Sequence, residues 1–269
     1  MFKFIKKLFI AIFATILLIP AVNAAPVLWV GDRVGQLGTV DVATGTANVI
    51  GRMSRAMTDI AFDSSGNLWG ISFGSLYKIN KTTATDTFVG NFGGQAQLNS
   101  LVFSSDGTLY AAGGSRLYSL NTATGSASSI GFDSQFNSSG DLAFVGGELF
   151  LSSTSRYDYD SLMKLDTSNA AATRIGALGE LGVYDVFGLA SPDGTNLYGL
   201  AGKSIYSVNT STGLGTFIRN YSGDGLLEAF GSAFMSEAVS AVPIPAAAFM
   251  FAPALLGFMG LRRRAKNKA

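Results

Sequence analysis

Chemistry in this 269-residue chain would have to come from carboxylates, hydroxyls and tyrosines, because the sequence contains no His and no Cys. These absences exclude a Ser-His-Asp triad, a histidine base and a thiol nucleophile. They also leave carboxylates as the charged metal ligands, and carboxylates favour calcium or magnesium over zinc or copper. With 18 acidic residues, chance alone supplies carboxylate pairs of the glycosidase type, so no pair by itself marks an active site.

Tyrosines and acidic residues gather in three connecting segments, at 152–161, 176–187 and 219–228. Aromatic faces stack on sugar rings, and carboxylates accept hydrogen bonds from hydroxyl groups or bind calcium. The segments therefore predict a polysaccharide-binding surface, with calcium as the cation it would take. The alternative is solvated loops whose aromatic rings pack down as lids. The candidate binding residues are Tyr157, Asp158, Tyr159, Asp160, Tyr184, Asp185 and Asp224.

A second polar group comes from one repeated position. Asp59 and Asp141 occupy the same place in two repeat units, and Ser100 occupies it in another. If that place faces the axis of a ring, two carboxylates and a hydroxyl converge there and hold an ion or water. A hydrated channel is the plainer alternative.

The elements that position these residues are repeats of about 40 residues, of which 101–131 is the clearest unit. Each unit reads as four short strands of alternating polarity separated by turns rich in Gly, Asn, Asp and Ser. The interval from an apolar residue of the third strand to one of the fourth is 13 residues in all five units. The pairs are Leu37 and Ile50, Leu76 and Val89, Leu117 and Ile130, Leu162 and Ile175, and Ile205 and Ile218.

A period near 40 with four strands per unit predicts an all-β fold, a β-propeller of five four-stranded blades. The first unit lacks its first strand, and a lone strand at 229–235 resembles the first strands at 59–62 and 141–144. We expect this lone strand to complete the first blade and close the ring. Second-to-third and blade-to-blade connections emerge on one face of such a ring, so the three long segments should crowd together there.

Residues 1–24 predict a secretory signal peptide, with a basic start, an apolar run and a cleavage site after Ala24. The predicted propeller domain, 25–238, keeps 11 of the 19 basic residues and all 18 acidic ones, a net charge of −7. So acidic a domain is a poor partner for nucleic acid or anionic lipid.

The last segment, 239–269, contains an uncharged stretch at 244–261 that is long enough for a transmembrane span. A basic tail at 262–268 follows, and positive charge stays on the cytoplasmic side, so the domain should face outward.

The order of these features resembles the PEP-CTERM class of sorting signal, in its Val-Pro-x-Pro-Ala variant. The motif is VPIPAAA at 242–248, and the resemblance extends to residue 266. It implies an exopolysaccharide-producing Gram-negative host, transient insertion in the inner membrane, and removal of the tail by an exosortase-type enzyme. The alternative is a plain membrane anchor. The residues that carry the resemblance are Val242, Pro243, Pro245, Ala246, Arg262, Arg263 and Arg264.

The repeat units, such as DIAFDSSGNLWG at 59–70, are similar to those of NHL-like and lactonase-like propellers. This resemblance concerns the fold, which serves many functions. Taken together, the sequence favours a non-catalytic binding or structural protein of the cell surface or exopolysaccharide matrix, without a required cofactor. The alternatives are an extracytoplasmic carboxylate hydrolase, a calcium-dependent lactonase-like enzyme, and a membrane-anchored periplasmic binding domain.

Overall fold

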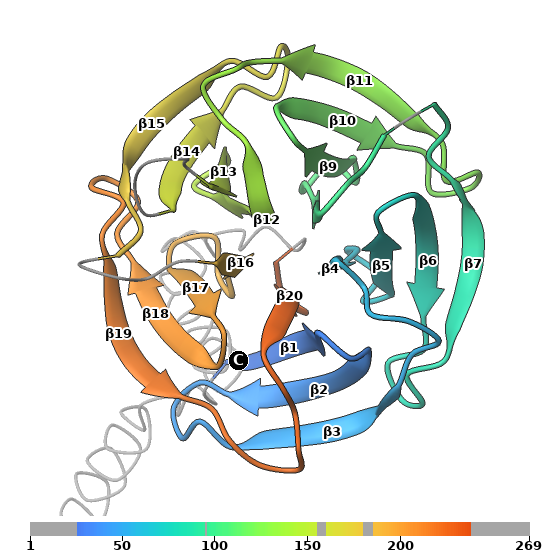
Figure 1. Cartoon of the computed structure of the whole chain (residues 1–269), viewed down its shortest axis with the longest axis vertical. Helices are drawn as coiled ribbons and strands as arrows, with labels where there is room; N and C mark the ends of the chain where they lie inside the picture. The colour runs from blue at the N-terminus through green and yellow to red at the C-terminus, as the bar shows by residue number, and fades with distance from the viewer. Residues whose placement is uncertain (1–25, 95, 155–159, 180–184, 238–269) are drawn as a thin grey trace, which may run out of the picture.

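The computed structural model describes residues 26–94, 96–154, 160–179 and 185–237. Within them, twenty strands form five four-stranded antiparallel sheets around a central axis (Figure 1). The prediction of a five-bladed β-propeller is confirmed. The predicted signal peptide and sorting segment lie outside the described residues. In the part that is described, no helix is long and apolar enough to cross a membrane.

Counted outward from the axis, the strands of each blade are A, B, C and D. Blade 1 has β20 (Ala229–Phe234), β1 (Val27–Asp32), β2 (Gln36–Asp41) and β3 (Ala47–Arg52). Blade 2 has β4 (Asp59–Phe62), β5 (Leu68–Ser72), β6 (Ser75–Ile79) and β7 (Asp86–Asn91). Blade 3 has β8 (Ser100–Phe103), β9 (Leu109–Gly113), β10 (Arg116–Leu120) and β11 (Ala127–Phe132). Blade 4 has β12 (Ser138–Val145), β13 (Glu148–Ser153), β14 (Ser161–Leu165) and β15 (Ala172–Ala177). Blade 5 has β16 (Val186–Ala190), β17 (Leu197–Ala201), β18 (Ser204–Val208) and β19 (Gly215–Asn220).

The ring closes where the two ends of the described chain meet. Strand β20 pairs antiparallel with β1, with Leu28 opposite Phe234, and supplies the strand that the first repeat lacks. This pairing covers the inner edge of β1, which would otherwise expose unpaired backbone groups. The predicted closure of blade 1 from the other end of the chain is therefore correct.

The C–D turns of the five blades share one design. In four blades an Asp or Asn at the end of strand C accepts hydrogen bonds from backbone amides two and three residues on, as Asn80 does from Thr82 and Thr83. In blade 4, Asp166 accepts from the Ser168 amide and from the Asn169 side chain. The fourth residue after the Asp or Asn has a positive φ, as the turn requires, and is Gly in three blades. Ala84 and Ala170 take this place in blades 2 and 4, with φ of 60° and 66°. Both are completely buried, so packing of the methyl group compensates for the left-handed strain.

The apolar residue of strand D in the 13-residue interval sits at a β-bulge. In blade 2, for example, Leu76 pairs with Gly90 and Tyr77 with Phe88, which leaves Val89 as the extra residue. The register shifts at the equivalent place in the other four blades. The bulge turns this side chain inward, where it packs on a hydrophobic cluster of the core.

The two faces of the ring carry different parts of the chain. The face with the B–C and D–A connections, here called the loop face, holds the segments singled out for binding. The A–B and C–D turns lie on the opposite face, and so do both ends of the described chain. Glu237 contacts the A–B turn of blade 5 there, where its Oε1 accepts a hydrogen bond from the Ser191 amide at 3.1 Å.

Candidate functional site

The structure describes three of the seven candidate binding residues, Asp160, Asp185 and Asp224. Tyr157, Asp158, Tyr159 and Tyr184 lie outside the described residues. Asp160 and Asp185 lie close together between blades 4 and 5, since their charges interact. Asp224 lies elsewhere, in the connection between β19 and β20, where it is exposed and has a φ of 45°.

Asp160 positions the loops rather than facing solvent. Its side chain is buried, and its Oδ2 accepts hydrogen bonds from the Ser139 hydroxyl and the Val186 amide, both at 2.8 Å. Its own carbonyl accepts from the Leu178 amide at 2.7 Å. Burial and then the nearby Asp185 raise the pKa of Asp160. Asp160 thus ties the B–C connection of blade 4 to the connection that follows the blade, and the exposed group of the pair is Asp185.

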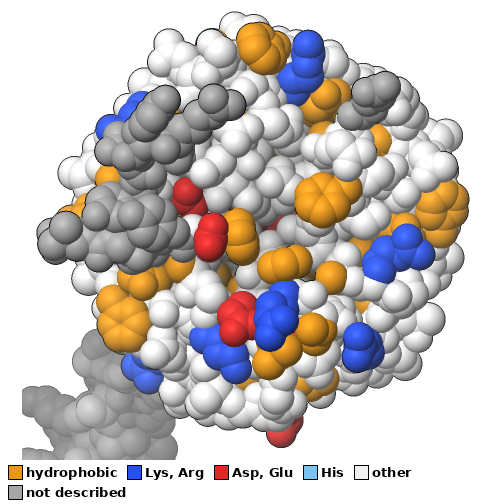
Figure 2. Space-filling model, viewed as in Figure 1, with side chains coloured by type: hydrophobic (Ala, Val, Ile, Leu, Met, Phe, Trp, Pro, Cys, Tyr) orange, Lys and Arg blue, Asp and Glu red, His pale blue; other side chains and the backbone are white. Residues whose placement is uncertain are grey.

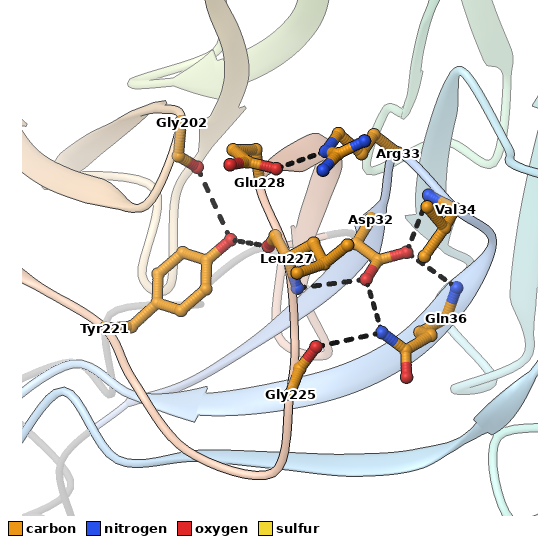
Figure 3. A network of polar contacts seen from close by, with 9 residues as sticks. All are labelled: Asp32, Arg33, Val34, Gln36, Gly202, Tyr221, Gly225, Leu227 and Glu228. Carbon is orange, nitrogen blue, oxygen red and sulfur yellow. Dashed lines mark hydrogen bonds and ion pairs between the residues drawn. The ribbon is translucent and has the colours of Figure 1, made fainter.

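A network centred on Asp32 holds the last connection of the ring in place (Figure 3). Asp32 is buried, and its Oδ1 accepts from the amides of Val34 at 3.0 Å and Gln36 at 2.7 Å. Its Oδ2 accepts from the Gln36 side chain at 2.8 Å and from the Leu227 amide at 3.0 Å. One carboxylate therefore joins the first B–C turn to the last D–A connection, close to where β20 pairs with β1.

Tyr221 and an ion pair complete this network. The buried Tyr221 hydroxyl donates to the Leu227 carbonyl at 2.5 Å and is 3.4 Å from the Gly202 carbonyl (Figure 3). Burial raises the pKa of Tyr221, so the hydroxyl stays a donor. Arg33 and Glu228 form an exposed ion pair above it. The sequence did not predict this network. Its only sign there is an acidic residue, Asp32, at the end of a strand, which is common at turns.

Replacing Asp32 with Ala is expected to free the connection 221–228 from the first hairpin. Three backbone amides would lose their acceptor, at a total cost of about 2 kcal/mol or more. Amide hydrogen exchange in 221–228 should become at least tenfold faster. The variant Glu228→Gln serves as the control, because an exposed ion pair contributes little to stability. Unchanged exchange in Asp32→Ala would contradict the role given to the carboxylate.

A large hollow lies on the loop face at blades 3 and 4, with a volume of about 710 Å³. Its wall is mainly hydroxyl and amide groups, with one charged side chain, Arg174. Arg174 is exposed, and its Nε donates to the Ser161 hydroxyl at 3.1 Å. The buried Phe136 and Met163 give the hollow an apolar part. The residues that line it are Ser115, Ser134, Gln135, Phe136, Asn137, Ser153, Thr154, Ser161, Met163 and Arg174.

This hollow adjoins the longest B–C connection of the ring, since Thr154 precedes residues 155–159 directly. The sequence pointed to that connection by its length and its Tyr and Asp residues. It gave no sign of the hollow beside it, because Arg174 and Gln135 come from a neighbouring strand and from another blade.

The structure brings the predicted channel residues together inside the ring. The A strands surround the axis (Figure 1), and Asp59, Ser100, Asp141, Gly188 and Gly231 occupy equivalent positions on them. The side chains of Asp59 and Asp141 share a hydrogen bond, and both are completely buried. The Ser100 hydroxyl pairs with that of Ser138. A methyl group on Gly231 would lie 2.5 Å from Asp59 Oδ1, so this glycine leaves the space that the carboxyl group needs.

Each channel carboxyl group fastens neighbouring blades. Asp59 accepts from the Ile60 amide of its own strand at 2.7 Å and from the Leu101 amide of the next A strand at 2.5 Å. Asp141 does the same with Leu142 and Leu189, both at 2.7 Å. Two inner strand junctions of the ring are thus held by side-chain carboxyl groups, a use of these residues that the sequence did not indicate.

Burial sets the protonation of this pair. Desolvation, and then the charge of Asp141, raise the pKa of Asp59 well above its ordinary value. Desolvation also raises the pKa of Asp141 and that of Glu237, and the charge of Asp141 raises the pKa of Glu237 further. The two carboxylate oxygens of Glu237 accept hydrogen bonds from the Ser191 and Phe234 amides. A proton shared between Asp59 and Asp141 satisfies the contact between the two carboxyl groups. Among the described residues, no group of three or more acidic side chains has the arrangement of a metal site.

Comparison with known proteins adds information on the fold. No family model matches the chain, and no curated protein matches it. A chain in the crystal structure of a nidogen/laminin complex superposes with a TM-score of 0.51 at 14% sequence identity, over 78% of this chain and 81% of that one. The likeness is one of fold. A structure from work on the evolutionary emergence of a symmetrical protein gives a TM-score of 0.48 at 18% identity, over 75% and 96% of the two chains. A protein of unknown function from Bacteroides caccae gives 0.45 at 11% identity, over 74% of each chain.

Proposed function

We propose that this chain is an exported, surface- or matrix-associated propeller that binds polysaccharide on its loop face. The observation that carries this proposal is the polar hollow of about 710 Å³ beside the longest B–C connection. Hydroxyl and amide groups in its wall can exchange hydrogen bonds with sugar hydroxyls, and the apolar part can contact the C–H face of a sugar ring. A site of this kind serves binding without a reactive group.

Arg174 gives the hollow a preference among sugars. It is the one charged group among the residues that line the hollow, and Ser161 orients its guanidinium. A guanidinium pairs with a carboxylate in two parallel hydrogen bonds. A polysaccharide that carries uronic acid units is therefore the class that we expect to bind more tightly than a neutral one. The candidate residues Tyr157 and Tyr159 follow Thr154 in the B–C connection of blade 4, and Tyr184 belongs to the connection after that blade. We expect them to supply stacking surfaces.

The test is binding of the purified protein to polysaccharide from its host, and to uronic acid and neutral oligosaccharides, by isothermal titration. Replacing Arg174 with Ala should weaken binding of the acidic glycan about tenfold or more, since a hydrogen bond to a charged group contributes about 1.5–3 kcal/mol. Arg52→Ala, an exposed arginine of another blade, is the control. Replacing the three tyrosines with Ala should weaken both glycans. Unchanged binding in all of these variants would disprove the proposal.

Export and sorting form the second half of the proposal, and the PEP-CTERM-like segment is its support. Both ends of the described chain lie on the face opposite the loop face, so a C-terminal anchor leaves the loop face directed away from the membrane. The intact mass of the protein from its host, with cell fractionation, tests this. Loss of residues 1–24 and of the tail, with recovery outside the inner membrane, is the expected result. A retained tail in the inner membrane would instead indicate an anchored periplasmic domain.

A further inference from the structure

A second, smaller cavity lies at the entrance to the channel on the loop face. Its volume is about 110 Å³, and the residues that line it are Thr58, Phe73, Asn99, Ser139, Gly140, Phe187 and Phe230. Thr58, Asn99, Gly140, Phe187 and Phe230 each stand directly before the channel position of their A strand. The five strands thus supply one residue each to the rim, which we call the channel mouth. Hydrophobic side chains are visible around the centre of this face in Figure 2.

Three phenylalanines give the channel mouth aromatic walls. Phe187 and Phe230 meet edge to face, with ring centroids 5.8 Å apart and an angle of 85° between the rings. Phe73, from the B–C turn of blade 2, is 55% exposed beside them. A methyl group at Gly140 would lie 2.8 Å from the Phe187 Cα, so the glycine lets Phe187 approach the axis. Exposed aromatic faces around a small cavity favour a ligand that carries positive charge or C–H groups.

The polar side chains of the channel mouth donate their protons to other groups of the protein, which leaves their oxygen atoms as acceptors for a ligand. The Thr58 hydroxyl donates to backbone carbonyls, with Leu98 at 3.1 Å and Ile71 at 3.2 Å. The Ser139 hydroxyl donates to Asp160, and the Asn99 amide nitrogen donates to the Ser138 carbonyl at 3.1 Å. The proton of each hydroxyl is committed, so its lone pairs are what remains for a molecule in the cavity.

Asn99 adds an unsatisfied acceptor. Its Nδ2 contact with the Ser138 carbonyl fixes which way the amide points, because two oxygens would repel each other there. Its Oδ1 is enclosed and has no hydrogen-bond partner among the described residues. An enclosed carbonyl oxygen without a donor is destabilising. Asn99 lines the cavity, so a donor that reaches this oxygen would remove the penalty.

We propose that the channel mouth binds a primary alkylammonium group. Such a group supplies three N–H donors for the acceptors of Thr58, Ser139 and Asn99, and its methylene groups and charge suit the phenylalanine rings. No Lys or Arg is among the described residues that line the cavity. The acidic Asp59 and Asp141 lie one residue deeper, which makes the axis unsuited to an anion. The small volume of the cavity, about 110 Å³, suits the end of an alkylammonium chain.

This site is independent of the polysaccharide proposal, because none of its residues lines the larger hollow. The alkylammonium group has two sources, a free amine or the lysine side chain of a peptide. Isothermal titration of the full-length protein with n-butylammonium chloride distinguishes charge from size when n-butanol is titrated in parallel. A lysine-containing tripeptide and its norleucine counterpart distinguish a peptide source from a free amine.

We expect n-butylammonium to bind and n-butanol to bind at least tenfold more weakly. Phe73→Ala should weaken n-butylammonium binding at least fivefold. Phe88→Ala is the matched control, because Phe88 belongs to the same blade, is also 55% exposed and lies on the outer strand β7. Asn99→Leu should weaken binding as well, with the thermal midpoint of every variant measured to confirm folding. Equal binding of the amine and the alcohol, no binding of either, or equal losses in Phe73→Ala and Phe88→Ala would overturn the proposal.

Discussion

Replacing Gly131 with Ala is expected to lower the free energy of unfolding by about 3 kcal/mol, near the upper end of what overpacking costs. Gly131 follows the bulge of β11, where the C–D turn of blade 4 packs against blade 3. A methyl group there would lie 2.0 Å from the Asn169 carbonyl oxygen and 3.0 Å from the Ala170 methyl carbon. Two backbones would have to separate, so the junction between the blades would open rather than adjust.

The same close approach recurs around the ring. Gly90 faces the Thr124 carbonyl at 1.8 Å and Gly176 faces the Thr212 carbonyl at 1.9 Å, counted from an added methyl carbon. Urea denaturation of Gly131→Ala measures the loss, and Gly74→Ala is the control because no atom lies within 4 Å of a methyl group at that position. Equal unfolding midpoints of the two variants would show that the blade junctions are looser than the structure indicates.

The second large effect is a fall in stability as the pH rises from about 4 toward neutrality. Asp59, Asp141 and Glu237 have raised pKa values in the folded protein, chiefly through burial. Unfolded carboxyl groups titrate near pH 4, so above this pH the folded state holds protons that the unfolded state has lost. Each such proton lowers the free energy of unfolding by about 1.4 kcal/mol per pH unit, until the pH passes the folded pKa.

Carboxyl groups with lowered pKa values reduce the stability of the folded protein in acid. Asp63 and Asp133 have lowered pKa values, the former through hydrogen bonds that outweigh burial, and their stabilisation is lost as the pH falls below about 4. We therefore expect the urea midpoint to be highest between about pH 4 and 5. Glu237→Gln should flatten the decline above pH 5, and Asp133→Asn should leave it unchanged. A midpoint that rises from pH 5 to pH 8 would contradict the raised pKa values.

The fold could be predicted in detail because its main signals are local. Strand polarity, turn residues and the 13-residue interval all depend on neighbours in the chain, and the structure confirms the five blades and the closing strand. The bulge at Val89 and its equivalents was out of reach. An apolar residue in strand D looks the same in a regular pair and in a bulge, since the difference lies in the partner strand.

The candidate site was predictable only where one strand position repeats. Asp59, Ser100 and Asp141 share such a position, so the axis could be expected to gather them. The hydrogen bonds by which Asp59 and Asp141 join adjacent A strands could not be predicted, because they depend on amides of the next blade. Arg174, Phe73 and Phe187 were missed. Their surroundings come from turns of different blades, and only the closed ring brings these together. Asp160 was predicted as a binding residue from the composition of its loop, but its side chain is buried, which the composition did not indicate.

The way the described chain ends has a mechanical consequence. A force on the chain beyond Glu237 would meet β20 at Phe234, the end at which its pairs with β1 would open one after another. Before that, the load must break the contacts of the final turn with blade 5, where Glu237 holds the Ser191 amide and Ser236 holds the Pro192 carbonyl. Tension from a tethered tail would thus pass into a neighbouring blade first. The strand that closes the ring would be shielded until this short clasp gives way.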